Sequence, residues 1–137
     1  MGLVYAEIIL KNSGDNVRLH ERLIAEKQVR MTVVNALVDT GCGTLVINEE
    51  VRKQLGLSIT GLRGTTLADG ARHICQQTEP VEVRWKDRSM TCQALVMPGV
   101  DTVLLGVIPL EDMDLMVNPA GYELIGAHGD EVMCTIL

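Results

Sequence analysis

One acid lies where acids are rarely found. The segment 36–41 reads ALVDTG, so Asp39 ends an apolar stretch that is predicted to be a buried strand. An ionised aspartate is almost never fully buried unless it is paired or hydrogen-bonded. Thr40 supplies a neighbouring hydroxyl, and Gly41 lets another backbone come close. The pattern indicates either a working acid of an active site or an aspartate that only caps its own turn.

The cysteines and histidines do not form a recognisable metal motif. No two cysteines make a Cys-x-x-Cys pair, and the three histidines cluster with none of them. This spacing argues against a local zinc site and is typical of reduced thiols in a cytosolic protein. The cysteines are Cys42, Cys75, Cys92 and Cys134.

An acidic group at Glu111, Asp112 and Asp114 is a second candidate for metal binding. Solvated positions in and around the first turns of a short helix, where the helix dipole favours carboxylates, explain it more simply. We therefore expect no metal and no cofactor.

Composition restricts the possible partners. The chain has 137 residues, of which 47% are hydrophobic and only 2% aromatic, with a net charge of −6. One domain with an aliphatic core is expected. Few aromatic residues argue against modules that stack nucleic-acid bases, and the negative charge disfavours a phosphate backbone, so no nucleic-acid partner is expected. No apolar run reaches the ~18–20 residues of a membrane span, and the first residues lack the basic region of a signal peptide, so we expect no membrane partner and a cytoplasmic location.

The elements that position Asp39 are predicted to be short strands. Strands are expected at 4–10, 29–38 and 45–47, with a turn at 12–15; the stretch 18–28 is either a short helix or a loop. A helix is expected at 49–55, because Asn48 is a suitable N-cap and Gly56 lies where a C′ residue belongs.

Later segments form two predicted hairpins and further strands. The first hairpin pairs 64–67 with 73–77 around Asp69-Gly70, which favours a type I′ turn with positive φ at both central residues. The second pairs 81–85 with 90–97. A buried strand at 103–107, a short helix at 110–114 begun by Pro109, and strands at 115–117 and 122–125 complete an all-β domain, a barrel or a sandwich.

In this context the chain resembles the retropepsin-like aspartic protease family, and more closely its small single-domain bacterial members, over residues 29–117. ALVDTG is similar to the family's catalytic strand and loop, and LVI at 45–47 with Asn48 to the strand and turn after it. The helix to LGL at 55–57 matches the helix of the bacterial and ubiquitin-associated branches. TLADG at 66–70 falls at the flap hairpin, VLLG at 103–106 at the motif behind the catalytic loop, and 110–114 at the C-terminal helix.

The resemblance implies an all-β, closed acid-protease barrel with one lobe per chain and one or two short helices. It implies a domain that spans 1–137, with a core at about 3–125. It also assigns site residues. These are Asp39, Thr40 and Gly41 for catalysis; Leu67, Ala68, Asp69, Gly70 and Ala71 for the substrate-binding flap and groove; and Leu104, Leu105 and Gly106 for support of the site.

The single triplet implies a homodimer, because the second catalytic aspartate has to come from a second copy across a twofold axis. Two close carboxylates would share one proton; one would activate water as a base, and the other would protonate the carbonyl oxygen. Thr40 hydroxyls would bridge the two loops. An extended peptide would bind as an added strand under the flap. The tail at 126–137, or the N-terminal strand from Leu3, would interleave into a dimer sheet or fray.

Two positions depart from the family pattern. Cys42 stands where alanine is usual and is expected to pack as an inert apolar group, with redox control of activity as the alternative. Val107 follows Gly106, where the family often has a polar or charged residue that supports the dimer or the loop, which puts the dimer's stability in question. An aspartic endopeptidase is the first functional hypothesis. A non-catalytic peptide-binding domain with the same fold is the second, and a structural barrel in which Asp39 only caps a turn is the third.

Overall fold

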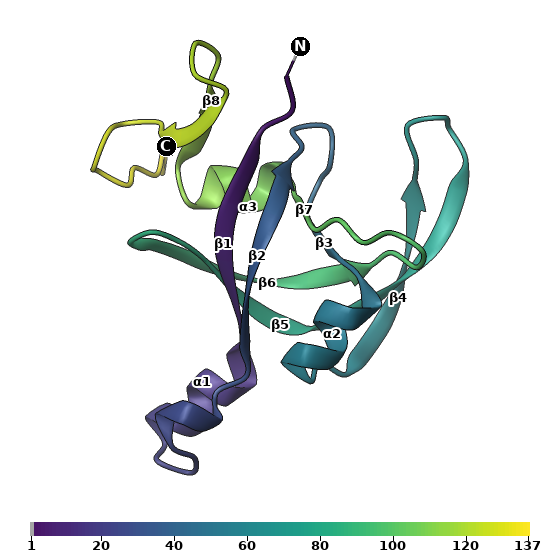
Figure 1. Cartoon of the computed structure of the whole chain (residues 1–137), viewed down its shortest axis with the longest axis vertical. Coiled ribbons are helices and arrows are strands. Elements are labelled where there is room, and N and C mark those ends of the chain that lie inside the picture. Colours follow the sequence, from purple (N-terminus) through teal and green to yellow (C-terminus); the bar gives the residue numbers. More distant parts are fainter. Residues whose placement is uncertain (1) are drawn as a thin grey trace.

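The strands form a ring with one hairpin projecting from it. The computed structural model describes residues 2–137. Seven strands form one sheet in the order β1-β2-β7-β3-β6-β5-β4, and β1 also pairs with β5, so the sheet closes on itself and leaves β4 outside the ring (Figure 1). These strands are β1 (Tyr5–Asn12), β2 (Met31–Val38), β3 (Leu45–Ile47), β4 (Ile59–Thr66), β5 (Arg72–Trp85), β6 (Arg88–Val96) and β7 (Leu104–Leu105).

Three short α-helices and a second small sheet complete the fold. The helices are α1 (Ser13–His20), α2 (Glu49–Leu55) and α3 (Val107–Asp112), with a 3-10 turn η1 (Glu26–Gln28). Strands β8 (Leu115–Asn118) and β9 (Glu123–Gly126) pair antiparallel. The expected all-β class is confirmed, with one helix more than predicted. No helix among residues 2–137 is long and apolar enough to cross a membrane.

The inside of the ring is filled by aliphatic side chains, as the composition predicted. Ile8, Leu10, Leu45, Ile47 and Leu105 are fully buried there, which couples β1, β3 and β7 through one core. Inward residues alternate with outward ones along β1, the pattern of a strand with one buried face.

Helix α2 forms where its capping residues predicted it. The Asn48 side chain accepts a hydrogen bond from the Val51 amide at 2.8 Å, and Gly56 ends the helix in the left-handed conformation at φ 62°. The Asn48 amide group also donates to the carbonyl of Asp101 at 2.5 Å, so the cap ties α2 to the segment before β7.

The segment predicted as a turn at 12–15 is the start of α1. The Asn12 side chain accepts a hydrogen bond from the Asp15 amide at 3.0 Å and so acts as the N-cap. Asn, Ser, Gly and Asp favour turns and helix N-termini for the same reason, since their short side chains bond to nearby amides. The open choice at 18–28 resolves into the end of α1, a loop and η1.

Helix α3 begins earlier than predicted, at Val107 rather than near Pro109, with Gly106 as its N-cap. Strand β7 is correspondingly reduced to two residues. Glu111 and Asp112 therefore lie at the end of α3 and not in its first turn, so the helix dipole does not account for them. Asp114 lies beyond the helix, where its carboxylate contacts His128 Nδ1 at 2.7 Å and accepts a hydrogen bond from the Met133 amide at 3.0 Å.

The C-terminal segment is held against the α3–β8 turn. The buried Arg88 guanidinium donates to the carbonyls of Met113 and Asp114 at 3.0 and 2.8 Å and also to the carbonyl of Gly129. The predicted tail is thus anchored as far as Met133. The last apolar residues, Ile136 and Leu137, are fully exposed.

Candidate functional site

Asp39 follows directly on β2 and is held by its backbone and its side chain together. Its amide donates to the Leu105 carbonyl at 3.0 Å, and its carbonyl accepts from the Cys42 amide at 3.1 Å. Its Oδ1 accepts from the Gly41 amide at 2.9 Å, which is an Asx turn. The side chain is half-buried, and among the described residues only this one contact fixes it. Asp39 therefore caps its own turn, as one of the two sequence-based interpretations expected. The cap uses Oδ1 and leaves Oδ2 without a hydrogen bond among the described residues.

The turn rests on Gly106, which allows two backbones to approach closely. A Cβ atom at Gly106 would lie 2.3 Å from the Thr44 carbonyl oxygen and 2.6 Å from that of Cys42, so no other residue fits there. Strand β7 lies between β2, with which it runs parallel, and β3, with which it runs antiparallel. Leu104, Leu105 and Gly106, which the resemblance assigned to support of the site, lie on this strand and directly after it; that role stays a prediction.

The start of α3 also supports the turn. The Val107 amide donates to the Cys42 carbonyl at 2.8 Å, and the Ile108 amide donates to the Gly43 carbonyl at 3.2 Å. The first amides of a helix have no partners within the helix, so this loop satisfies two of them. The loop is therefore supported by the backbone at position 107, and a polar side chain is not needed for that task.

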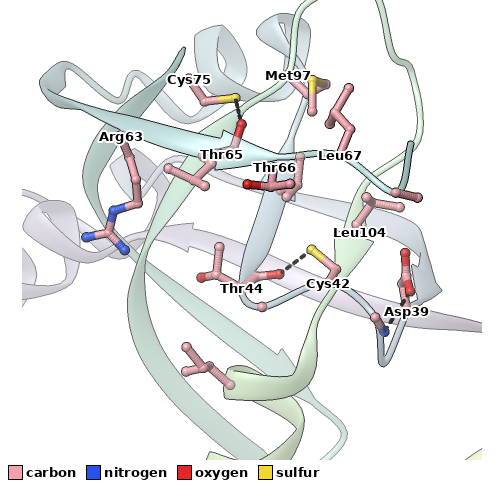
Figure 2. A pocket seen from close by; sticks show the side chains of 16 residues that line it. Asp39, Cys42, Thr44, Arg63, Thr65, Thr66, Leu67, Cys75, Met97 and Leu104 are labelled. Atoms are coloured by element: carbon pink, nitrogen blue, oxygen red, sulfur yellow. Dashed lines mark hydrogen bonds between the residues drawn. The ribbon is translucent and has the colours of Figure 1, made fainter. Parts of the chain in front are cut away.

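A cavity of about 710 Å³ lies between this turn and the β4–β5 hairpin. Asp39 and Gly41 line it from the turn, Leu67 and Ala68 from the hairpin, and Leu104 from β7 (Figure 2). Most of its wall is apolar or carries only hydroxyl and thiol groups. Ten further lining residues were not assigned to the site from the sequence: Gly43, Thr44, Val46, Arg63, Thr65, Thr66, Cys75, Leu95, Met97 and Ile108.

The remaining residues of the predicted flap lie at the hairpin tip and do not line the cavity. The Gly70 amide donates to the Leu67 carbonyl at 2.9 Å, and the Asp69 side chain accepts from the Ala71 amide at 2.8 Å. Of the two central residues expected to have positive φ, only Gly70 does, at 86°. The predicted type I′ turn is therefore wrong. The tip is a turn over 67–70 that places a left-handed glycine last, a common longer hairpin loop.

Thr40 is exposed and does not line the cavity, whereas Gly41 does. Cys42 is half-buried, and its thiol donates to the Thr44 carbonyl at 3.3 Å. Burial raises the pKa of this thiol above its ordinary value, and the nearby Asp39 raises it further. The thiol is therefore protonated at neutral pH and packs as an apolar group; redox control stays a prediction.

Within the described residues, Asp39 is the one carboxylate that lines the cavity. Hydrolysis by paired carboxylates requires a base for the water and an acid for the carbonyl oxygen. One Asp39 supplies one of these groups. The second group is not found among the described residues that line this cavity.

The comparisons with known proteins bear on the family and on the fold. The sequence profile of the family described as "gag-polyprotein putative aspartyl protease" matches residues 25–112. Among solved structures, the chain is similar to EIAV protease in complex with the inhibitor HBY-793, with a TM-score of 0.55 and 20% sequence identity. That similarity covers 81% of this chain and 88% of the other. No curated protein matches the sequence.

Proposed function

The chain belongs to this gag-type, retropepsin-like aspartyl protease family, and we propose that it is an aspartic endopeptidase that acts as a homodimer. The observation that carries the proposal is the position of Asp39. Its carboxylate is half-buried at the edge of a largely apolar cavity, oriented through Oδ1 by the Gly41 amide, with Oδ2 available. The matching family and the fold of a retroviral protease support a peptidase-type function for this cavity.

The proposed reaction uses Asp39 of two copies, which meet on a twofold axis and share one proton. The ionised carboxylate takes a proton from a water molecule, and the water oxygen attacks the peptide carbonyl carbon. The protonated carboxylate gives its proton to the carbonyl oxygen, which forms a gem-diol with no bond to the protein. The C–N bond then breaks as the nitrogen takes a proton from one carboxylate and a gem-diol hydroxyl gives its proton to the other, which restores the shared proton.

Exposed groups near the turn suit the proposed twofold contact. Thr40 is exposed beside Asp39, so its hydroxyl is available to bridge to the second copy. The Val38 amide donates to the Val4 carbonyl at 2.8 Å, so the N-terminal segment runs beside the turn. The turn, the hairpin tip and the segment that leads into β1 lie toward one end of the long axis, with α1 at the other (Figure 1). We propose that this end forms the dimer.

A digest of a peptide library, read by mass spectrometry, tests the endopeptidase. The variants are Asp39→Asn, whose side-chain oxygen can still accept the Gly41 amide while the acid is removed, and Asp87→Asn as the control. Asp87 is an exposed aspartate of the β5–β6 turn and does not line the cavity. The proposal expects cleavage by the native chain and by Asp87→Asn and none by Asp39→Asn. Equal cleavage by Asp39→Asn would contradict it.

A further inference from the structure

The end of the cavity opposite Asp39 carries a positive charge. Arg63 projects from β4 there, while Asp39 lies at the other end (Figure 2). Alternate residues of a strand face the same side, and Arg63 and Thr65, two positions apart on β4, both line the cavity. Arg63 pairs in register with Cys75 of β5, which lines the cavity as well. The position of this arginine over the cavity is therefore set by the strand.

The Arg63 guanidinium has no protein partner among residues 2–137. It takes part in none of the side-chain hydrogen bonds or ion pairs of this part of the chain, whereas Arg30, for example, is bonded to Asp15. Arg63 is also the one cation among the described lining residues, and Asp39 is the one anion. Arg63 is exposed, so its charge is accessible to a ligand in the cavity.

We infer that Arg63 selects substrates with a carboxylate at a subsite away from the scissile bond; this rests on the proposed function. A peptide bound as an extended strand through the cavity passes from Asp39 toward Arg63. A guanidinium binds a carboxylate through two parallel N–H···O bonds. Neither the side-chain amide of Gln nor the ammonium group of Lys can replace the carboxylate of Glu in this pair. The chain's net charge of −6 repels acidic peptides at long range, so the selection comes from this local contact.

A twofold dimer gives the inference a distinctive signature. The second copy places its own Arg63 at the opposite end of the shared groove. Acidic residues are therefore favoured at equivalent positions on both sides of the cleaved bond. The carboxylate can belong to an acidic side chain or to the C-terminus of the peptide, and amidated and free C-termini distinguish the two sources.

The test is a digest of a peptide library in which Glu, Gln and Lys are compared at one position at a time on each side of the cleaved bond. The library is made with amidated and with free C-termini. The enzymes are the native chain, Arg63→Gln, Arg63→Glu and the control Arg72→Gln. Arg72 is an exposed arginine of the same hairpin that does not line the cavity, so its loss removes the same charge.

For the native chain and Arg72→Gln, we expect kcat/KM to be roughly two- to fivefold higher for Glu than for Gln at one position on each side of the cleaved bond. This is the size of effect that a partly exposed ion pair gives. The ratio falls to about one in Arg63→Gln, and Arg63→Glu prefers Lys. The Glu-to-Gln ratio of the native chain also decreases at high salt. If the native chain prefers peptides with a free C-terminus and does not distinguish Glu from Gln, the subsite binds the terminal carboxylate. Identical profiles for the native chain and both Arg63 variants overturn the inference.

Binding separates this inference from the proposed catalysis. Fluorescence anisotropy measures binding of labelled Glu-rich and Gln-rich library pools to Asp39→Asn, with and without Arg63→Gln. If the native chain cleaves nothing but the Glu-rich pool binds more tightly and only with Arg63 present, the carboxylate subsite stands and the endopeptidase does not. If no charge-dependent binding is found either, the subsite is overturned as well.

Discussion

At the residue scale, the two oxygens of the Asp39 carboxylate have different surroundings. Oδ1 accepts the Gly41 amide at 2.9 Å, and Oδ2 has no hydrogen bond within the described residues. A turn cap and a working acid are therefore not alternatives here, because the cap fixes the direction in which the acid points. The sequence revealed this residue through its unusual setting, an acid at the end of an apolar strand.

Asp15 is a buried acid that two arginines hold in its ionised form. Its side chain is 4% exposed, its Oδ2 lies 2.8 Å from Arg30 Nε, and its Oδ1 lies 2.7 Å from Arg18 Nη1. Hydrogen bonding to Arg30 lowers the pKa of Asp15 from 3.8 to about 2, with a smaller contribution from Arg18. The folded state therefore binds this proton more weakly than the unfolded chain does.

We predict that Asp15→Asn destabilises the protein by about 2 kcal/mol at pH 7. Because the folded pKa is depressed, the contribution is complete above about pH 4 and is lost as the pH falls through 2. Urea unfolding at pH 7, 4 and 2 measures the difference in unfolding free energy between native and variant, which should be largely lost at pH 2. Asp130→Asn, at an exposed acid, is the control. A difference that does not change with pH would contradict the assignment.

We predict that Gly106→Ala destabilises the protein by about 1–3 kcal/mol or more, because the new Cβ meets backbone atoms that cannot rotate away. The Asp39 turn is displaced with it, so cleavage falls as well. Gly43→Ala is the matched control, since a Cβ there meets nothing within 4 Å. Thermal unfolding of both variants measures the effect. Equal melting temperatures would show that the close packing is not needed.

At the scale of elements, local signals predicted some features and missed others for identifiable reasons. Helix α2 carries its own N-cap and C-terminal glycine, so its bounds follow from sequence. The start of α1 was missed because Asn12 can begin either a turn or a helix. The hairpin of β4 and β5 was predicted around Asp69-Gly70, but β4 begins at Ile59 and not at residue 64, so Arg63 was left outside it. Neither Arg63 nor Cys75 was assigned to the site, because nothing in the sequence shows which face of this hairpin covers the cavity.

The hairpin tip offers a prediction about the flap. Gly70 has a φ of 86°, which costs an L-residue about 1–2 kcal/mol. We predict that Gly70→Ala loosens the turn and speeds hydrogen exchange of the Leu67 amide, which donates to the Ala71 carbonyl at 2.9 Å. Gly64→Ala, in the same hairpin at a position without this strain, is the control. Unchanged exchange in Gly70→Ala would show that the tip relaxes without cost.

At the scale of the whole molecule, the chain supplies half of the proposed catalytic pair. The specific activity per chain is therefore predicted to fall on dilution, as dimers dissociate. Sedimentation velocity over the same concentrations should show the dimer disappearing in parallel. An activity per chain that stays constant while the protein is monomeric would rule out a shared site.

The most direct test of the central claim mixes the native chain with Asp39→Asn at a constant total concentration, above that at which dimers form. If two copies of Asp39 make one site, mixed dimers are inactive, and activity follows the square of the native fraction. An equal mixture then retains about one quarter of the activity. If each chain carries a complete site, the equal mixture retains about one half, and the shared pair of aspartates is contradicted.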